Sequence, residues 1–132
     1  MPHGKGDDFF DELLSMTSQV KRDLYKDLGS MQRANHAQLE TAKHQLDAAM
    51  ESARQGNYRE ALRFFLSLQK TLHESNLFRK ELAETYVAQA ICYAKLGDNK
   101  EMRAAWNKAC NIEPDDEKLK AIAVRLGLIK QS

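Results

Sequence analysis

The stretch AETYVAQAICYAKLGDNKEMRAAWNKACNIEPDD, residues 83–116, predicts two helices joined by a tight turn. Apolar and small residues recur in both halves at helical rather than strand spacing. They are Tyr86, Val87, Ala90, Ile91, Tyr93 and Ala94, then Met102, Ala105, Trp106, Ala109 and Ile112. Between the halves, Gly97 ends the first helix because glycine adopts a positive φ without steric cost. Asp98 or Asn99 can cap the next helix, and Pro114 ends it.

A similar turn lies upstream in QGNYREA, residues 55–61. It has a glycine, a polar residue, and then a glutamate and a small residue that open a helix. Gly56 and Gly97 are 41 residues apart. Two helices of this length cannot bury their apolar faces alone, so we expect two stacked helical hairpins with equivalent bends at the two glycines.

These two units resemble the tetratricopeptide repeat (TPR) family over residues 42–116. The residues that carry the resemblance in the second unit are Tyr86, Ala90, Tyr93, Gly97, Met102, Trp106, Ala109 and Pro114. Those in the first are Ala49, Gly56, Tyr58, Ala61, Phe65 and Leu68. The spacing exceeds the family's repeat of about 34 residues by close to two helical turns, so lengthened units can keep the same inner face. Met102 stands where the family prefers alanine, which implies a wider helix crossing.

The predicted fold class is all-α: antiparallel hairpins stacked as a short, TPR-like, right-handed α-solenoid with an extra N-terminal helix. We expect a disordered tail at residues 1–6 and one helical domain at residues 7–132. Its parts are an N-terminal helix (7–28), a first unit (30–74), a second unit (77–116) and a capping helix (116–130).

Composition narrows the class of protein. Few glycines and prolines among many Ala, Leu, Glu, Lys and Gln residues favour helices, and 132 residues suit one domain. A net charge of +1 without a basic stripe argues against nucleic acid as a partner. No apolar run approaches the roughly 20 residues of a membrane span, and the N-terminus lacks a secretory pattern. We therefore expect a cytoplasmic protein without membrane insertion.

The residues that could carry chemistry do not form a catalytic pattern. His36, Glu40 and His44 are spaced along one helix, but a zinc site there would usually set its histidines four apart and add a distant ligand. Cys92 and Cys110 occupy apolar helical positions, which is typical of buried thiols in a reducing compartment. We expect no enzyme activity, no metal site and no cofactor.

The TPR resemblance implies a concave groove lined by the first helix of each unit. Carried over by position, its residues are Lys43, Leu46, Met50, Arg54, Glu84, Val87, Ile91 and Lys95. This surface is apolar along the middle, with Lys43, Arg54 and Lys95 beside it, and suits the apolar side of an amphipathic helix. Either a partner or the protein's own helix over residues 9–28 can fill it, and the sequence leaves both open.

Two functions follow from these patterns. The first is a non-catalytic interaction module, an adaptor or scaffold, that holds a helical or extended segment of a partner protein. The second is a self-associating structural subunit, in which the N-terminal helix uses Phe9, Phe10, Leu13 and Leu14 to dock on another copy or to cover the groove. Attachment to a larger machine as a regulatory domain is a third reading.

Overall fold

The computed structural model describes residues 8–28, 36–73, 78–112 and 117–126, and these residues form helices and their turns without a strand. The helices are α1 (Asp8–Leu28), α2 (His36–Arg54), α3 (Tyr58–His73), α4 (Arg79–Leu96), α5 (Asn99–Ile112) and α6 (Glu117–Leu126). The predicted all-α class is confirmed. The expected tail at residues 1–6, an expected break at residues 29–30 and the turn at Pro114 lie outside the described residues.

Both turn glycines have the left-handed backbone that was expected of them. Gly56 has φ 80° and Gly97 has φ 82°. The N–H of Asn57 donates to the carbonyl of Ser52 over 2.9 Å, and the N–H of Asp98 donates to that of Tyr93 over 2.9 Å. Each bond closes the last turn of a helix in the same way, so the two bends are equivalent.

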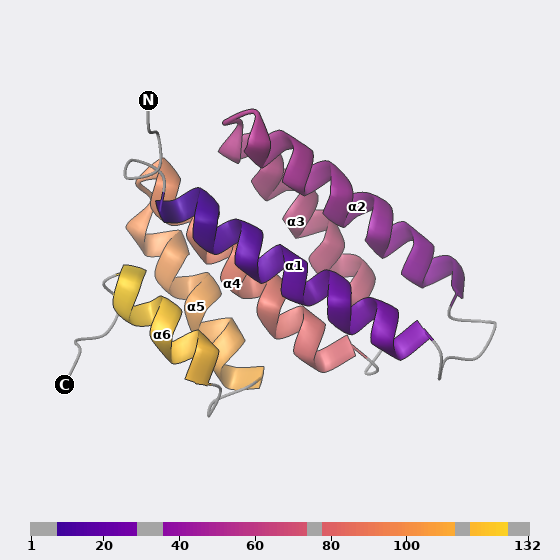
Figure 1. Cartoon of the computed structure of the whole chain (residues 1–132). Helices are drawn as coiled ribbons and strands as arrows, with labels where there is room; N and C mark the ends of the chain where they lie inside the picture. Colours follow the sequence, from indigo (N-terminus) through magenta and orange to yellow (C-terminus); the bar gives the residue numbers. More distant parts are fainter. Residues whose placement is uncertain (1–7, 29–35, 74–77, 113–116, 127–132) are drawn as a thin grey trace.

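The residue after each glycine caps the next helix. The Asn57 side-chain oxygen accepts the N–H of Glu60 at 3.1 Å, and Asp98 accepts that of Glu101 at 3.2 Å. These bonds satisfy N–H groups that have no partner within the helix. The predicted cap at Asp98 is confirmed, and α2–α3 and α4–α5 form two antiparallel hairpins (Figure 1).

The hairpins stack through α3 and α4. Gln89 of α4 is buried, and its amide donates to the Phe65 carbonyl at 3.3 Å and to the Gln69 side chain at 2.8 Å, both on α3. Phe65 and Leu68 are fully buried at this seam, whereas Phe64 is half-buried. The polar link fixes the register of the two hairpins, because a slip would leave a buried amide without partners.

Helix α4 lies at the centre of the molecule. It packs against α1, α3 and α5, and it also touches α6. Every residue from 81 to 92 is therefore buried, including Glu81, Glu84, Thr85 and Gln89. The sequence pattern predicted one apolar face on this helix, but the structure buries all of its faces over more than three turns.

Helix α1 lies across the stack and contacts α4 more extensively than α2 (Figure 1). The Arg125 guanidinium of α6 pairs with the Glu12 carboxylate, which links the last helix to the first. Within the described residues, no helix combines the length and the apolar character that crossing a bilayer requires.

Candidate functional site: the groove and its resident helix

The groove residues predicted from the sequence lie on α2 and α4, and the apolar ones are buried except Met50, which is half-buried. Leu46 is 2% exposed, and Val87 and Ile91 are fully buried. On α4, Glu84, Val87 and Ile91 share one face because they are three and four residues apart. Glu84 faces Asp23 of α1, so this is the face that α1 covers.

Helix α1 fits the groove through one apolar stripe. Leu13, Met16, Val20 and Leu24 are all buried and recur at steps of three, four and four. Phe10 is half-buried against the same core. The side chain of Phe9 lies outside the described part of the chain. Helix α1 therefore packs with this stripe on α2 and α4, the two helices that carry the predicted groove residues.

A cleft of about 400 Å³ remains open where α1 and α2 diverge. Its walls mix apolar and charged side chains from the two helices: Leu14, Thr17, Ser18, Lys21, Leu46, Asp47, Met50, Glu51 and Arg54. Three predicted groove residues are among them, and so is Leu14, which is 42% exposed. This cleft is the accessible part of the predicted groove.

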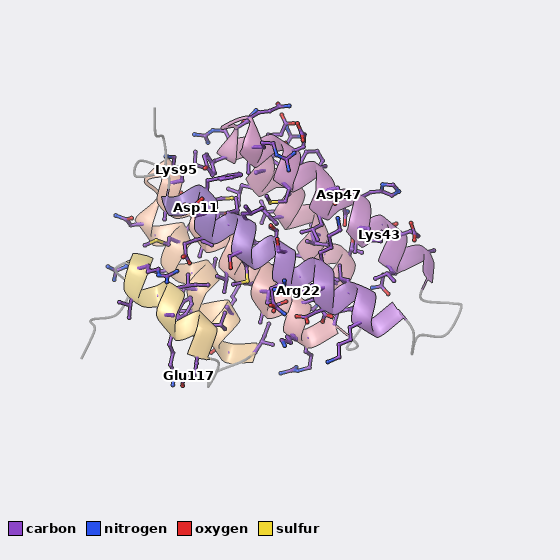
Figure 2. All side chains as sticks on the ribbon, viewed as in Figure 1. Asp11, Arg22, Lys43, Asp47, Lys95 and Glu117 are labelled. Atoms are coloured by element: carbon purple, nitrogen blue, oxygen red, sulfur yellow. The ribbon has the colours of Figure 1, made fainter. Side chains whose placement is uncertain are left out.

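Contacts across the cleft hold its walls together. The Thr17 hydroxyl lies 2.8 Å from the Met50 sulfur and 2.9 Å from the Leu13 carbonyl oxygen. On the wet side, Lys21 pairs with Asp47 over 3.6 Å. Figure 2 shows Asp11 near the start of α1 and Arg22 further along it, with Lys43 and Asp47 on α2.

The two predicted lysines of the groove already have partners within the chain. Lys43 pairs with Glu40 over 3.6 Å. The ammonium of Lys95 lies 5.5 Å from the centre of the Tyr58 ring, within cation–π range. Arg54 pairs with Glu51 on the same exposed turn. These cations lie beside the groove instead of lining an anion site.

Sequence reasoning missed an acid pair between α1 and α4. Asp23 accepts a hydrogen bond from Gln19 at 3.1 Å and pairs with Lys80 over 3.8 Å. Its second oxygen, Oδ2, and Oε1 of Glu84 are both buried and lack a conventional hydrogen-bond partner among the described residues. Asp23 borders the apolar stripe one residue before Leu24, and this position was the only signal in the sequence.

A shared proton accounts for the contact between the two carboxyls. Burial, a hydrogen bond to Asp23 and the charge of Asp23 together raise the pKa of Glu84 to about 9. Glu84 is therefore protonated at neutral pH and donates to the Asp23 carboxylate. The pair lies at the contact between α1 and α4.

A second cleft, of about 290 Å³, lies among α3, α4 and α5 and carries three basic side chains. Its lining is His73, Arg79, Leu82, Tyr86, Lys108, Asn111 and Ile112. Arg79 donates to the Ile112 carbonyl at 3.5 Å, and Lys108 lies 5.7 Å from the centre of the Tyr86 ring. The Arg79 bond reaches the last carbonyl of α5, at the negative end of that helix dipole, which favours a cation there.

Comparison with known proteins identifies a family. A family described as "Soluble NSF attachment protein, SNAP" matches residues 15–120, from α1 into α6. No curated protein and no solved structure matches the chain. The repeated helical hairpin expected from the TPR resemblance is present, but the matching family is a different one. The chain belongs to the soluble NSF attachment protein (SNAP) family.

Proposed function

We propose that this protein is a non-catalytic adaptor that binds an amphipathic helix of a partner protein in the groove between α2 and α4. Membership of a family of attachment proteins supports a role in holding proteins together. The observation that supports the proposal is that an amphipathic helix, α1, packs against the first helix of both hairpins. Because α1 is a helix, we infer a helical rather than an extended ligand. The proposal also includes a TPR-like mode of binding and a location in the cytoplasm.

The hairpins have contacts of their own that do not depend on α1. The packing of α2 on α3, α3 on α4 and α4 on α5 joins the four helices into one stack. The buried Gln89 bonds lie at the α3–α4 seam, away from α1. Exchange of α1 for another helix would therefore leave the stack in place, which is what a groove of this kind requires.

The test is a titration of the full chain with a labelled synthetic peptide of residues 8–28. We expect saturable binding by fluorescence anisotropy, together with faster hydrogen exchange in the chain's own α1. The matched control peptide carries Leu13→Glu and Val20→Glu, which place charges on the buried stripe, and it should not bind. The resident helix acts at a local concentration of about millimolar, so titration must reach that range. Absence of binding there contradicts the groove as a docking site.

Variants of the chain locate the contact. Met50→Glu changes a half-buried residue that touches Thr17 and should weaken peptide binding. Ala104→Glu adds the same charge at an exposed position of α5 and should leave binding unchanged. Changes at Leu46 or Ile91 are unsuitable, because both side chains are buried and their loss would unfold the protein.

Self-association through α1 is the second candidate, favoured by the exposure of Leu14 at the rim of the cleft. Leu13 is fully buried within the chain, so a second copy would have to exchange α1 with the first. Light scattering over a concentration series separates the candidates. A mass that stays monomeric, together with peptide binding, supports the adaptor, whereas a Leu14-dependent dimer supports self-association.

A further inference from the structure

The wall of the groove has an unfavourable charge arrangement at one point. Helix α4 places Lys80 and Glu84 beside Asp23 of α1, and Glu81 also acts on Glu84. With Glu84 ionised, its charge and that of Asp23 would repel each other, and Lys80 offsets part of this repulsion. Glu84 is 4% exposed and the Asp23 side chain is 13% exposed, so water screens little of this repulsion.

Helix α1 tolerates this arrangement only by taking up a proton. The Lys80 ammonium lies 3.8 Å from Oδ2 of Asp23, beyond hydrogen-bond distance, and Oε1 of Glu84 has no hydrogen-bond partner among the described residues. Protonating a glutamate at neutral pH costs free energy in proportion to the distance between the pH and its normal pKa. The apolar stripe of α1 packs well on α2 and α4, but the Asp23 carboxylate is unfavourable beside the buried Glu84.

We propose that the partner helix carries a lysine or arginine at the place that Asp23 occupies, so that Glu84 is ionised and paired when the partner is bound. This specificity rests on the proposed function. The expected partner pattern has apolar residues at positions n, n+3, n+7 and n+11, after Leu13, Met16, Val20 and Leu24. The basic residue follows at n+10, after Asp23. The partner's charge complements the buried Glu84 carboxylate.

A basic residue suits the position better than a neutral amide does. An ammonium or guanidinium group makes charge-assisted hydrogen bonds, which are stronger than neutral ones. Lys80 is exposed on one side and can turn towards solvent when its present partner, Asp23, is replaced. The partner's buried cation would pair with the Glu84 carboxylate. Removing that carboxylate would leave the cation buried without a counter-charge, which is costly, so the preference for a basic residue depends on Glu84.

The first arm of the test uses the full chain alone, with hydrogen exchange in α1 and urea unfolding as readouts. Asp23→Lys should slow exchange in α1 by about tenfold, the effect of one charge-assisted hydrogen bond. Asp11→Lys is the matched control, because it makes the same charge change at an exposed position of the same helix. In a Glu84→Gln background, the gain from Asp23→Lys should disappear. Equal effects of Asp23→Lys in both backgrounds overturn the proposal.

The second arm uses peptides of residues 8–28 titrated into the full chain. The Asp23→Lys peptide should bind about tenfold more tightly than the Asp11→Lys peptide. If both bind equally, the charge preference fails while the groove remains a docking site. If neither binds but the first arm gives its expected result, the proposed adaptor function fails while the preference at this position stands.

Discussion

At the scale of single residues, two glycines set the path of the chain. An added Cβ at Gly56 or Gly97 would meet no atom within 4 Å, so space does not explain these glycines. Their φ values of 80° and 82° do, because L-residues with a side chain rarely adopt them.

We expect Gly97→Ala to lower the free energy of unfolding by about 1 kcal/mol, since the alanine must hold a left-handed backbone. Gly97→Asn should lower it less, because asparagine tolerates this conformation better. Urea unfolding measures both. Asn107→Ala, at an exposed position of α5, is the control and should change little. Equal stability of the alanine and asparagine variants would contradict the backbone explanation.

The two thiols make a second residue-scale prediction. Burial raises the pKa of Cys92 to about 12, and it raises the pKa of the half-buried Cys110 as well. Both thiolates are therefore scarce at pH 8, but only Cys110 can be reached by solvent. A thiol reagent followed by mass spectrometry should label Cys110 first, and both residues at equal rates in urea. Labelling of Cys92 at the rate of Cys110 in the folded protein contradicts the packing of α4.

At the scale of elements, α1 behaves as a ligand that is joined to the chain. Four of its apolar residues are buried in the groove, whereas Leu14 at its edge stays 42% exposed. Substitutions on the buried face of α1 should therefore destabilise its packing strongly, whereas substitutions on the neighbouring face that carries Leu14 should have little effect.

Leu24→Ala should lower the free energy of unfolding by about 2–4 kcal/mol, because it leaves a cavity between α1 and the stack. Leu14→Ala removes the same atoms from a side chain that is already partly in water, and it should cost about 0.5 kcal/mol or less. Urea unfolding of the two variants measures the contrast. A similar cost for both changes would show that α1 is not held in the groove in solution.

The elements differ in how far the sequence could predict them. The turns at Gly56 and Gly97 and the cap at Asp98 follow from local backbone chemistry. A few neighbouring residues of the sequence are therefore enough to predict them. The stripe of α1 predicts that the helix needs a partner, but the same stripe fits a groove in its own chain or in another. The burial of Glu84 was not predictable, because it depends on α1, which packs on α4 from a distant part of the sequence.

At the scale of the whole molecule, stability should depend on pH through the pair of Asp23 and Glu84. The pKa of Glu84 is about 9 in the folded chain and near 4.5 when the residue is exposed. The protonated form is thus favoured by folding, and its contribution is complete below about pH 4.5 and lost as the pH rises towards 9. The groups that act on Glu84 are Asp23, Lys80 and Glu81.

Glu84→Gln removes this titration and keeps a donor for Asp23. As the pH rises from 5 to 8, the free energy of unfolding of the variant should increase relative to that of wild type by about 1–3 kcal/mol. The reason is that one unit of pKa is worth about 1.4 kcal/mol. Urea unfolding at a series of pH values measures the difference, which cancels the titration of all other groups. A difference that stays constant over this range would show that Glu84 is ionised in the folded protein.

The position of α1 across two hairpins also bears on the curvature of the stack. Because α1 touches both α2 and α4, it restrains the angle between the hairpins in addition to the α3–α4 seam. A replacement helix of the same length would preserve that restraint, whereas one that reached only α4 would leave the angle to the seam alone. The length of a bound helix would thus be converted into a change in superhelical shape, which any protein attached further along the solenoid would experience.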